Sequence, residues 1–156
     1  MAENTQEKVE FVRNTISEIL NKLGVLSSLE FQEGAEESWF ILKSDEAPLL
    51  IGEGGQNLAA LNHVVRRIVE KKYGETDIRF LIDVNDYHKK HVEEIKDMAR
   101  MHAQRVRYFK KPIEMRPMNA YERRIVHTVL QEYPDISTES TGEGMGRRVV
   151  IKPLNL

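Results

Sequence analysis

Apolar residues recur at every third or fourth position in four segments of the chain, which is the periodicity of an amphipathic helix. The first stripe begins at Val9 and ends at Leu23, directly before Gly24. A glycine at this place commonly ends a helix in the left-handed conformation. The second stripe begins at Leu58 and is followed by Gly74. The pattern therefore predicts a helix of about 18 residues near the N-terminus and a second long helix further along the first half.

Strands are predicted before and after the second helix. Val25–Gln32 and Ser38–Lys43 flank a polar turn segment, and Ile78–Val84 has the alternation of a strand. Residues 39–42 form an unbroken apolar run, as expected for a strand that is covered on both faces. The first half is thus predicted to run helix, strand, strand, helix, strand.

The third stripe predicts a long helix that leads into the second half. Asn85 and Asp86 both favour the N-cap position, and Pro112 ends the helix. The sequence near residue 85 is not rich in Gly, Ser or Pro, so a flexible linker is not indicated. We therefore expect an α+β protein with two abutting small domains, residues 1–85 and 86–156, joined by this helix.

The fourth stripe predicts a shorter helix near the C-terminus. Asn119 and Glu122 have the spacing of a capping box. On a helical wheel Tyr121 falls on the apolar face, whereas Arg123 and His127 lie one turn apart on the solvent face. Strand patterns lie on both sides of this helix: Ile113–Met118, Ile136–Thr141 and Arg147–Lys152.

The two halves differ in charge. Residues 1–85 hold 9 Lys and Arg against 15 Asp and Glu, a net charge of −6, whereas residues 86–156 hold 14 against 10, a net charge of +4. A polyanionic partner is therefore expected to bind the second half. The chain has no cysteine, which excludes disulfides, thiol catalysis and cysteine-based zinc sites.

The sequence indicates no targeting to a membrane. Its apolar runs are far shorter than the roughly 20 residues that span a bilayer. Residues 1–4 have neither the basic nor the apolar region of a secretory signal. We therefore expect a soluble, cytoplasmic protein without membrane insertion.

A glycine-rich loop separates the apolar residues 49–51 from the second helix. It consists of Gly52, Glu53, Gly54 and Gly55. Such a loop lets phosphates approach the N–H groups at a helix start, but the Gly-Lys-Ser/Thr of a Walker loop and the G-x-G-x-x-G of a dinucleotide loop are both missing. The string Leu-Ile-Gly-x-x-Gly-x-x-Leu, with the helix and strand that follow, resembles the core of a KH domain, which clamps about four nucleotides. The preceding helix and strand resemble the type II arrangement.

The loop departs from many KH domains at Glu53, where Lys or Arg often helps to hold phosphate. A carboxylate beside a phosphate is repulsive, by roughly 1 kcal/mol when exposed. Two interpretations therefore remain open. The first half is either a KH domain that binds nucleic acid through its loop or a KH fold kept as a packing module.

Arg123 and His127 belong to a longer string, Met-Asn-Ala-Tyr-Glu-Arg-Arg-x-x-His, that begins at Met118. A second string, Thr-x-Ser-x-Gly-x-Gly-x-x-Arg-Arg-Val-Val-Ile-x-Pro, runs from Thr138 to Pro153. Arg-x-x-x-His on an exposed helix is the signature of the R-three-H domain, a single-stranded nucleic-acid-binding module. Together the strings resemble the bacterial Jag family (SpoIIIJ-associated, also called KhpB), in which a KH domain directly precedes an R-three-H domain. We expect the chain to lack the Jag-N domain that many members carry.

The resemblance implies a binding protein that acts on single-stranded RNA or single-stranded DNA. Arg123 would offer a planar fork of donors to a phosphate, and His127 would donate to a phosphate or stack on a base. Further basic residues would widen this surface: Arg116, Arg147, Arg148 and Lys152. The resemblance also implies a role as an RNA chaperone or regulator linked to cell shape and division. The alternative is an interaction scaffold whose KH half docks a partner, such as a small KH-domain protein.

Catalysis and metal binding are weakly indicated. His88, His91 and Glu94 follow one another at three-residue spacing on a helix and could supply metal ligands, but His-Glu-x-x-His does not occur. A solvated charged face is the simpler interpretation. The nucleophile elbow G-x-S-x-G is also missing. We therefore expect no catalytic residues, no metal and no cofactor.

Overall fold

The computed structural model describes residues 2–75 and 78–154. They form a mixed α+β structure that divides into two compact units, unit 1 up to His88 and unit 2 from Lys89 onward. The division lies close to the boundary expected after residue 85. No helix in the two described stretches combines the length and the apolar character that crossing a bilayer requires.

Unit 1 follows the predicted order of elements, with one short helix added before the glycine loop. Its elements are α1 (Ala2–Leu23), β1 (Ser28–Gln32), β2 (Ser38–Lys43), α2 (Ala47–Ile51), α3 (Gln56–Tyr73) and β3 (Phe80–Val84). Gly24 and Gly74 end α1 and α3 as predicted, with positive φ angles of 71° and 77°. The N–H of Gly74 donates to the carbonyl of Glu70 at 2.8 Å, which closes the last turn of α3.

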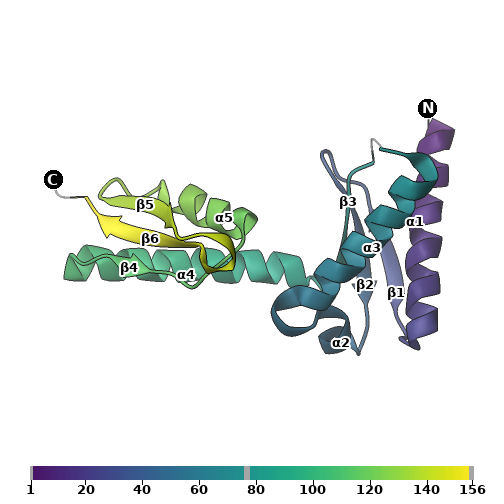
Figure 1. Cartoon of the computed structure of the whole chain (residues 1–156), viewed down its shortest axis with the longest axis horizontal. Helices are drawn as coiled ribbons and strands as arrows, with labels where there is room; N and C mark the ends of the chain where they lie inside the picture. The colour runs from purple at the N-terminus through teal and green to yellow at the C-terminus, as the bar shows by residue number, and fades with distance from the viewer. Residues whose placement is uncertain (1, 76–77, 155–156) are drawn as a thin grey trace. The chain divides into compact units, whose positions relative to one another are not determined.

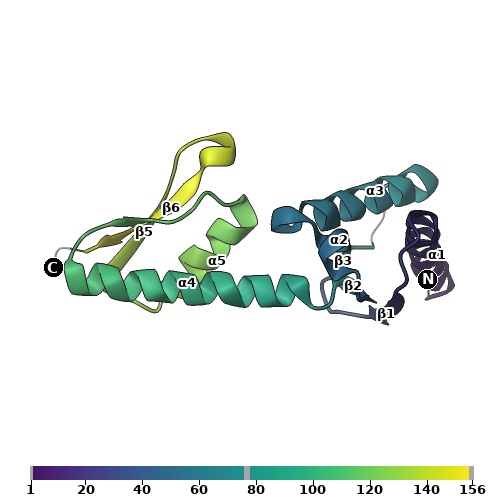
Figure 2. The ribbon, with the colours of Figure 1, turned by 90° about the horizontal axis from the view of Figure 1, so that it is seen from below.

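The three strands of unit 1 form one sheet in the order β1-β2-β3, with β1 antiparallel and β3 parallel to β2. α1 and α3 cover one face of it (Figures 1 and 2). Phe40 and Leu42 belong to the core beneath these helices, whereas Trp39 and Ile41 lie outside it. Residues 40–42 are nevertheless all buried, so the prediction that β2 is covered on both faces is confirmed for these three residues. Ile41 is 7% exposed, and Trp39 on the same face packs against the ring of His88.

Unit 2 contains most of the long helix and a second sheet. The elements are α4 (Tyr87–Phe109), β4 (Ile113–Glu114), α5 (Ala120–Leu130), β5 (Ile136–Thr141) and β6 (Arg148–Pro153). α4 begins in unit 1 and continues across the division, as expected for the joining helix. β4 is shorter than predicted. After it, the N–H groups of Met115 and Met118 donate to the carbonyls of Val149 and Arg147, but these two hydrogen bonds do not continue the regular strand pairing.

The start of α4 differs from the prediction. Asn85 and Asp86 have φ angles of 49° and 58°, whereas an N-cap residue is ordinarily extended. The buried carboxylate of Asp83 instead accepts from the N–H of His88 at 3.0 Å. The Asn85 side chain exchanges two hydrogen bonds with the backbone of Ser44 and so holds two connections of unit 1 together.

The second sheet has the order β4-β6-β5 and is antiparallel throughout. The central strand places Val149 and Ile151 on one face, where both are fully buried. α4 and α5 supply most of the other core residues, so both helices pack on this face. Their buried apolar residues are Ile95, Ala99, Ala103, Val106, Val126, Val129 and Leu130.

Candidate nucleic-acid interface

A buried carboxylate organises the N-terminal end of α5. Asn119 and Glu122 form the predicted capping box, in which each side chain accepts from the other residue's N–H at 2.9 Å. Glu122 is 9% exposed, and its other oxygen lies 2.6 Å from Nε2 of His91 and 3.9 Å from a guanidinium nitrogen of Arg116. A carboxylate this deeply buried needs such partners. Glu122 therefore holds Arg116 near the start of α5.

Two more of the predicted residues meet at Met118, directly before the cap. A guanidinium nitrogen of Arg123 donates to the Met118 carbonyl at 2.8 Å, and the Met118 N–H donates to the Arg147 carbonyl at 3.0 Å. The side chains of Arg116 and Arg147 are exposed, and that of Arg123 is half-buried. The structure thus brings three predicted residues to the positive pole of α5: Arg116 and Arg123 by their side chains, and Arg147 by its backbone carbonyl. These three residues are named the arginine cluster.

His127 lies one turn further along α5 and does not face solvent as the wheel predicted. Its Nδ1 lies 2.6 Å from Oγ1 of Thr138, and its Nε2 lies 2.9 Å from Oγ of Ser140. Both hydroxyls belong to residues of β5, so the ring of His127 links α5 to the second sheet. A hydroxyl can donate or accept, which satisfies both nitrogens of a neutral imidazole. The solvent-face prediction is wrong because the wheel contained α5 alone; by the same error Tyr121, expected in the core, is 54% exposed.

The surroundings of His127 also set its charge. Partial burial lowers the pKa of the ring below its ordinary value of 6.5, and the nearby positive charge of Arg123 lowers it further. The neutral form is therefore favoured near neutral pH. The positive charge at this end of unit 2 accordingly comes from the arginine cluster.

Arg148 and Lys152 lie on the other face of the sheet. They alternate along β6 with the buried Val149 and Ile151, so their side chains point away from α5. A guanidinium nitrogen of Arg148 is 3.6 Å from a carboxylate oxygen of β4, and Lys152 pairs with a carboxylate of β5. The structure does not bring these two residues together with the arginine cluster, and their part in binding stays a prediction.

The G-x-x-G loop between α2 and α3 contains a short 3₁₀ turn, Glu53–Gly55, and is exposed at Glu53 and Gly54. Gly52, Gly54 and Gly55 all have positive φ, the region that glycine tolerates best. A Cβ on Gly52 would lie 2.6 Å from a neighbouring side chain, and one on Gly55 would lie 3.1 Å from the ring of Tyr87. A Cβ on Gly54 would meet nothing within 4 Å. Packing within unit 1 thus demands the outer glycines, whereas Gly54, beside the exposed Glu53, remains open to a ligand.

A groove between α4 and α5 holds basic residues that the sequence patterns did not single out. Lys96 and Arg100 of α4 and Arg124 of α5 line it together with Tyr121, around a volume of about 400 Å³. The two α4 cations pair with acidic residues on their own helix, at 3.1 and 3.5 Å, and Arg124 is exposed. These residues belong to two different helices, and only the packing of α4 against α5 brings them to one groove.

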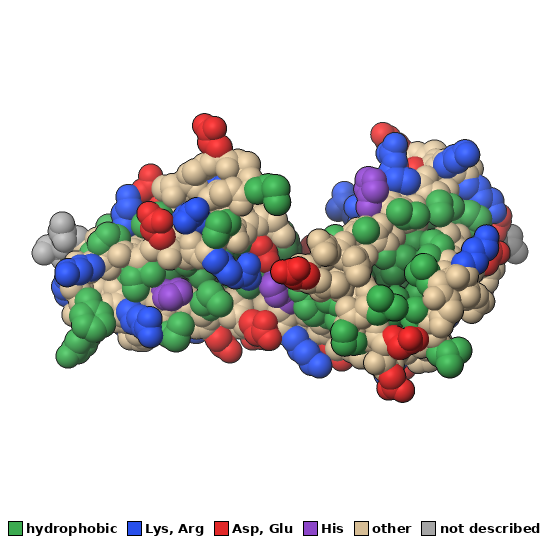
Figure 3. Space-filling model, turned by 60° about the horizontal axis from the view of Figure 1, so that its bottom comes forward, with side chains coloured by type: hydrophobic (Ala, Val, Ile, Leu, Met, Phe, Trp, Pro, Cys, Tyr) green, Lys and Arg blue, Asp and Glu red, His purple; other side chains and the backbone are tan. Residues whose placement is uncertain are grey.

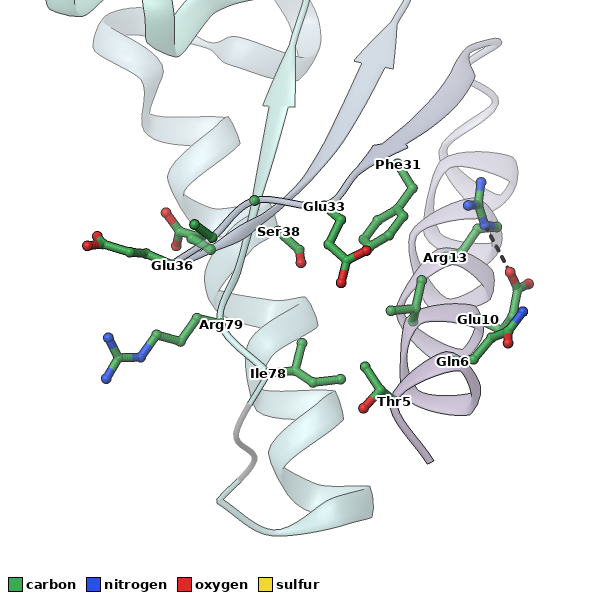
Figure 4. A pocket seen from close by; sticks show the side chains of 14 residues that line it. Thr5, Gln6, Glu10, Arg13, Phe31, Glu33, Glu36, Ser38, Ile78 and Arg79 are labelled. Carbon is green, nitrogen blue, oxygen red and sulfur yellow. Dashed lines mark ion pairs between the residues drawn. The ribbon is translucent and has the colours of Figure 1, made fainter. Parts of the chain in front are cut away.

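A cavity of about 680 Å³ in unit 1 has a mixed lining with a net negative charge (Figure 4). α1, the connection between β1 and β2, and the residues before β3 surround it. Its lining has more carboxylates than cations. The carboxylates are Glu10, Glu33, Glu36 and Glu37, and the cations are Arg13 and Arg79. A lining of this charge disfavours phosphate and suits a basic partner.

The histidines at three-residue spacing on α4 have different partners. The ring of His88 packs against Trp39, with centroids 5.5 Å apart, and His91 lies against Glu122. Among the residues that the structure describes, no three His, Asp or Glu side chains come together in a way that could hold a metal ion. The charged face of α4 thus takes part in packing and capping.

Comparison with known proteins identifies relatives over both units. Residues 93–153 match the R-three-H domain family. The RNA-binding protein KhpB of Clostridium symbiosum is 33% identical over 150 residues, which cover 96% of this chain and 66% of that protein. The RNA-binding protein KhpB of Bacillus subtilis is 32% identical over 127 residues, which cover 80% and 61%.

A third relative, the RNA-binding protein KhpB of Lactiplantibacillus plantarum, is 26% identical over 133 residues, which cover 85% of this chain and 41% of that protein. The chain therefore spans only part of the length of each of these relatives. The matches nevertheless extend over most of this chain, and the R-three-H match coincides with unit 2. The chain belongs to the Jag (KhpB) family.

Proposed function

We propose that the protein binds single-stranded nucleic acid, RNA in preference to DNA, and that the arginine cluster makes the main contact. One observation carries the proposal: the side chains of Arg116 and Arg123 and the backbone of Arg147, from separate segments, come together at the positively polarised start of α5. The names of the relatives and the R-three-H match support it. RNA is favoured because the relatives are named RNA-binding proteins and the KH domain is a module of RNA recognition.

Arg123 is well placed to hold a phosphate. Its bond to the Met118 carbonyl fixes one arm of the guanidinium, and the rest of the fork can donate to an anion. His127 acts as a positioning residue, because its ring holds α5 on β5. Phosphate contacts position a strand without reading its bases, so we expect little sequence preference from this site.

The two units would divide the work between a type II KH domain at residues 1–85 and an R-three-H domain at residues 86–156. The G-x-x-G loop between α2 and α3, preceded by α1 and β1, supports the first assignment. Gly54 leaves room for a strand at the tip of the loop, but the carboxylate of Glu53 repels phosphate. The loop therefore contributes less affinity than the arginine cluster.

A second candidate function is a scaffold in which unit 1 docks a protein partner. The negatively charged cavity and the exposed Glu53 favour a basic protein surface over a phosphate backbone. A small KH-domain protein is the partner that the family resemblance suggests. A role as an RNA chaperone or regulator in cell shape and division rests on that resemblance alone.

Fluorescence anisotropy with a labelled single-stranded RNA of mixed sequence tests the main proposal. The intact chain is compared with Arg123→Ala/Arg147→Ala, which removes two charges from the cluster. Arg148→Ala/Lys152→Ala is the matched control, since it removes two charges from the other face of the sheet. We expect the cluster variant to bind roughly tenfold more weakly or worse, and the control to change far less. Single-stranded DNA and duplex RNA serve as competitors.

The other outcomes separate the alternatives. Equal weakening in both variants would assign binding to net charge rather than to the cluster. Unchanged binding in both would overturn the arginine cluster as the main contact. Failure of the intact chain to bind any strand at low salt would overturn the proposal and leave the scaffold as the better explanation.

A further inference from the structure

Two large aromatic side chains stand in solvent at the end of α4. Tyr108 is 81% exposed and Phe109 is 63% exposed. Their ring centroids are 4.9 Å apart and their planes are inclined by 82°. Single exposed apolar residues are ordinary, but two adjacent exposed rings in contact form an apolar patch that packing within the fold does not explain.

Positive charge surrounds this pair. Arg105 lies on the last turns of α4, Lys110 and Lys111 follow directly after Phe109, and all three are exposed. Residues 98–113 contain five Lys and Arg and no Asp or Glu. Cations near a helix C-terminus are favoured by the helix dipole, which accounts for part of the charge but not for the aromatic rings. Hydrophobic side chains project beside Lys and Arg where α4 ends (Figure 3).

The end of α4 is held in place from the side. Nε of Arg107 donates to a carboxylate oxygen of Asp135 at 2.7 Å, and the same guanidinium lies 5.6 Å from the ring centroid of Tyr133. These contacts tie the last turn of the helix to the connection between α5 and β5. The aromatic pair is thus carried on a fixed backbone, which lowers the entropy lost when a ligand binds.

We propose that Tyr108 and Phe109 form a stacking platform for bases of the bound single strand, with Lys110 and Lys111 on its phosphates. The inference rests on the proposed function and extends it to a second contact, at the opposite end of α4 from its start in unit 1. Every base has a π-face, so aromatic side chains beside cations bind single strands with little regard for sequence. The purely basic segment selects a polyanion over a neutral apolar partner.

Anisotropy with labelled single-stranded RNA and the intact chain tests the platform. Tyr108→Ala/Phe109→Ala should weaken binding about tenfold or more, and Tyr108→Trp should preserve it, because an indole stacks as well. Replacing bases of the RNA by abasic spacers should largely abolish the difference between the intact chain and the alanine variant. Lys110→Ala/Lys111→Ala should weaken binding more than Lys89→Ala/Lys90→Ala, a matched exposed lysine pair at the start of the same helix.

Several results would overturn the platform. If the intact chain binds RNA and the aromatic variant binds it equally well, the platform is excluded but the proposed function is not. An aromatic effect of the same size on abasic RNA would exclude stacking. Failure of the intact chain to bind RNA would overturn both proposals together. In that case, aromatic-dependent retention on anionic phosphatidylserine vesicles would assign the patch to a lipid surface. Unchanged circular dichroism and melting of each variant exclude misfolding as the cause.

Discussion

At the scale of single residues, the protonation of His127 affects how α5 is held on β5. Partial burial and the charge of Arg123 lower the pKa of its ring in the folded protein, whereas the unfolded chain keeps a pKa near 6.5. The unfolded state therefore binds more protons as the pH falls through this range. We expect the free energy of unfolding to decrease below about pH 6.5 and to decrease less in His127→Asn.

Urea unfolding at about pH 7.5 and about pH 5.5 measures this dependence. His102 contributes in the same direction, because burial and Arg105 lower its pKa as well. His102→Asn should therefore also reduce the pH dependence of the free energy of unfolding, and the reductions from the two substitutions should add if the sites are independent. A pH dependence that is the same in His127→Asn as in the unaltered chain would contradict the assignment.

Glu122 gives the second prediction at this scale. Replacing it by Ala removes one half of the capping box and the carboxylate that faces His91. Loss of an N-cap costs roughly 0.5–2 kcal/mol, and Glu122→Ala also removes a carboxylate partner of His91, so the free energy of unfolding should fall by about 1 kcal/mol or more. Glu122→Gln keeps an oxygen for the cap and should lose less. Urea denaturation measures the free energy of unfolding of both variants. Equal decreases would show that Glu122 stabilises the fold through its charge rather than through the cap.

Local residue patterns were predictable where the partners are close in sequence. The Asn119–Glu122 box needs only one helical turn, and the structure confirms it. The partners of His127 stand 11 and 13 residues further along the chain, on another element. A wheel of α5 does not contain β5, which is why it placed the ring in solvent.

At the scale of elements, the loop between α2 and α3 decides whether unit 1 meets nucleic acid. Glu53 is exposed at its tip, so Glu53→Lys exchanges a repulsive charge for an attractive one without disturbing the core. If the loop contacts a phosphate backbone, binding of single-stranded RNA should tighten roughly fivefold to tenfold, on the order of 1 kcal/mol. Anisotropy titrations with the RNA used for the arginine cluster measure the change.

Glu36→Lys is the matched control for this loop. It makes the same charge change at another exposed position of unit 1, on the connection between β1 and β2. An equal gain in both variants would reflect the net charge of the unit, and no gain in either would count against a role of the loop in binding.

The helices and strands were predictable from periodicity and glycine positions, whereas the polar contacts between them were not, because those contacts join residues far apart in sequence. The wheel of α3 would leave Asn62 in solvent, yet its amide bonds both the N–H and the carbonyl of Ile82, at 2.8 and 2.9 Å. This pairing occupies part of the free edge of β3, where another strand could otherwise add. Asp83 serves the start of α4 in the same non-local way.

At the scale of the whole molecule, the opposite charges of the two halves indicate where a polyanion binds. The sequence alone predicted the acidic first half and the basic second half, and the arginine cluster and the α4 end both fall in unit 2. It did not predict which face of β6 the helices cover, and this face decides that Arg148 and Lys152 point away from the cluster.

Salt dependence tests this division of charge, since each phosphate contact on a single strand contributes about −0.7 to the slope of log K against log salt. Three to five contacts predict a slope of about −2 to −3.5 for the intact chain. Arg123→Ala should make the slope shallower by about 0.7, because one contact is lost, and Arg148→Ala should leave it unchanged. Anisotropy titrations at several salt concentrations give both slopes. An equal change in the two variants would mean that the strand follows both faces of the sheet, and the arginine cluster would then be one part of a diffuse basic surface.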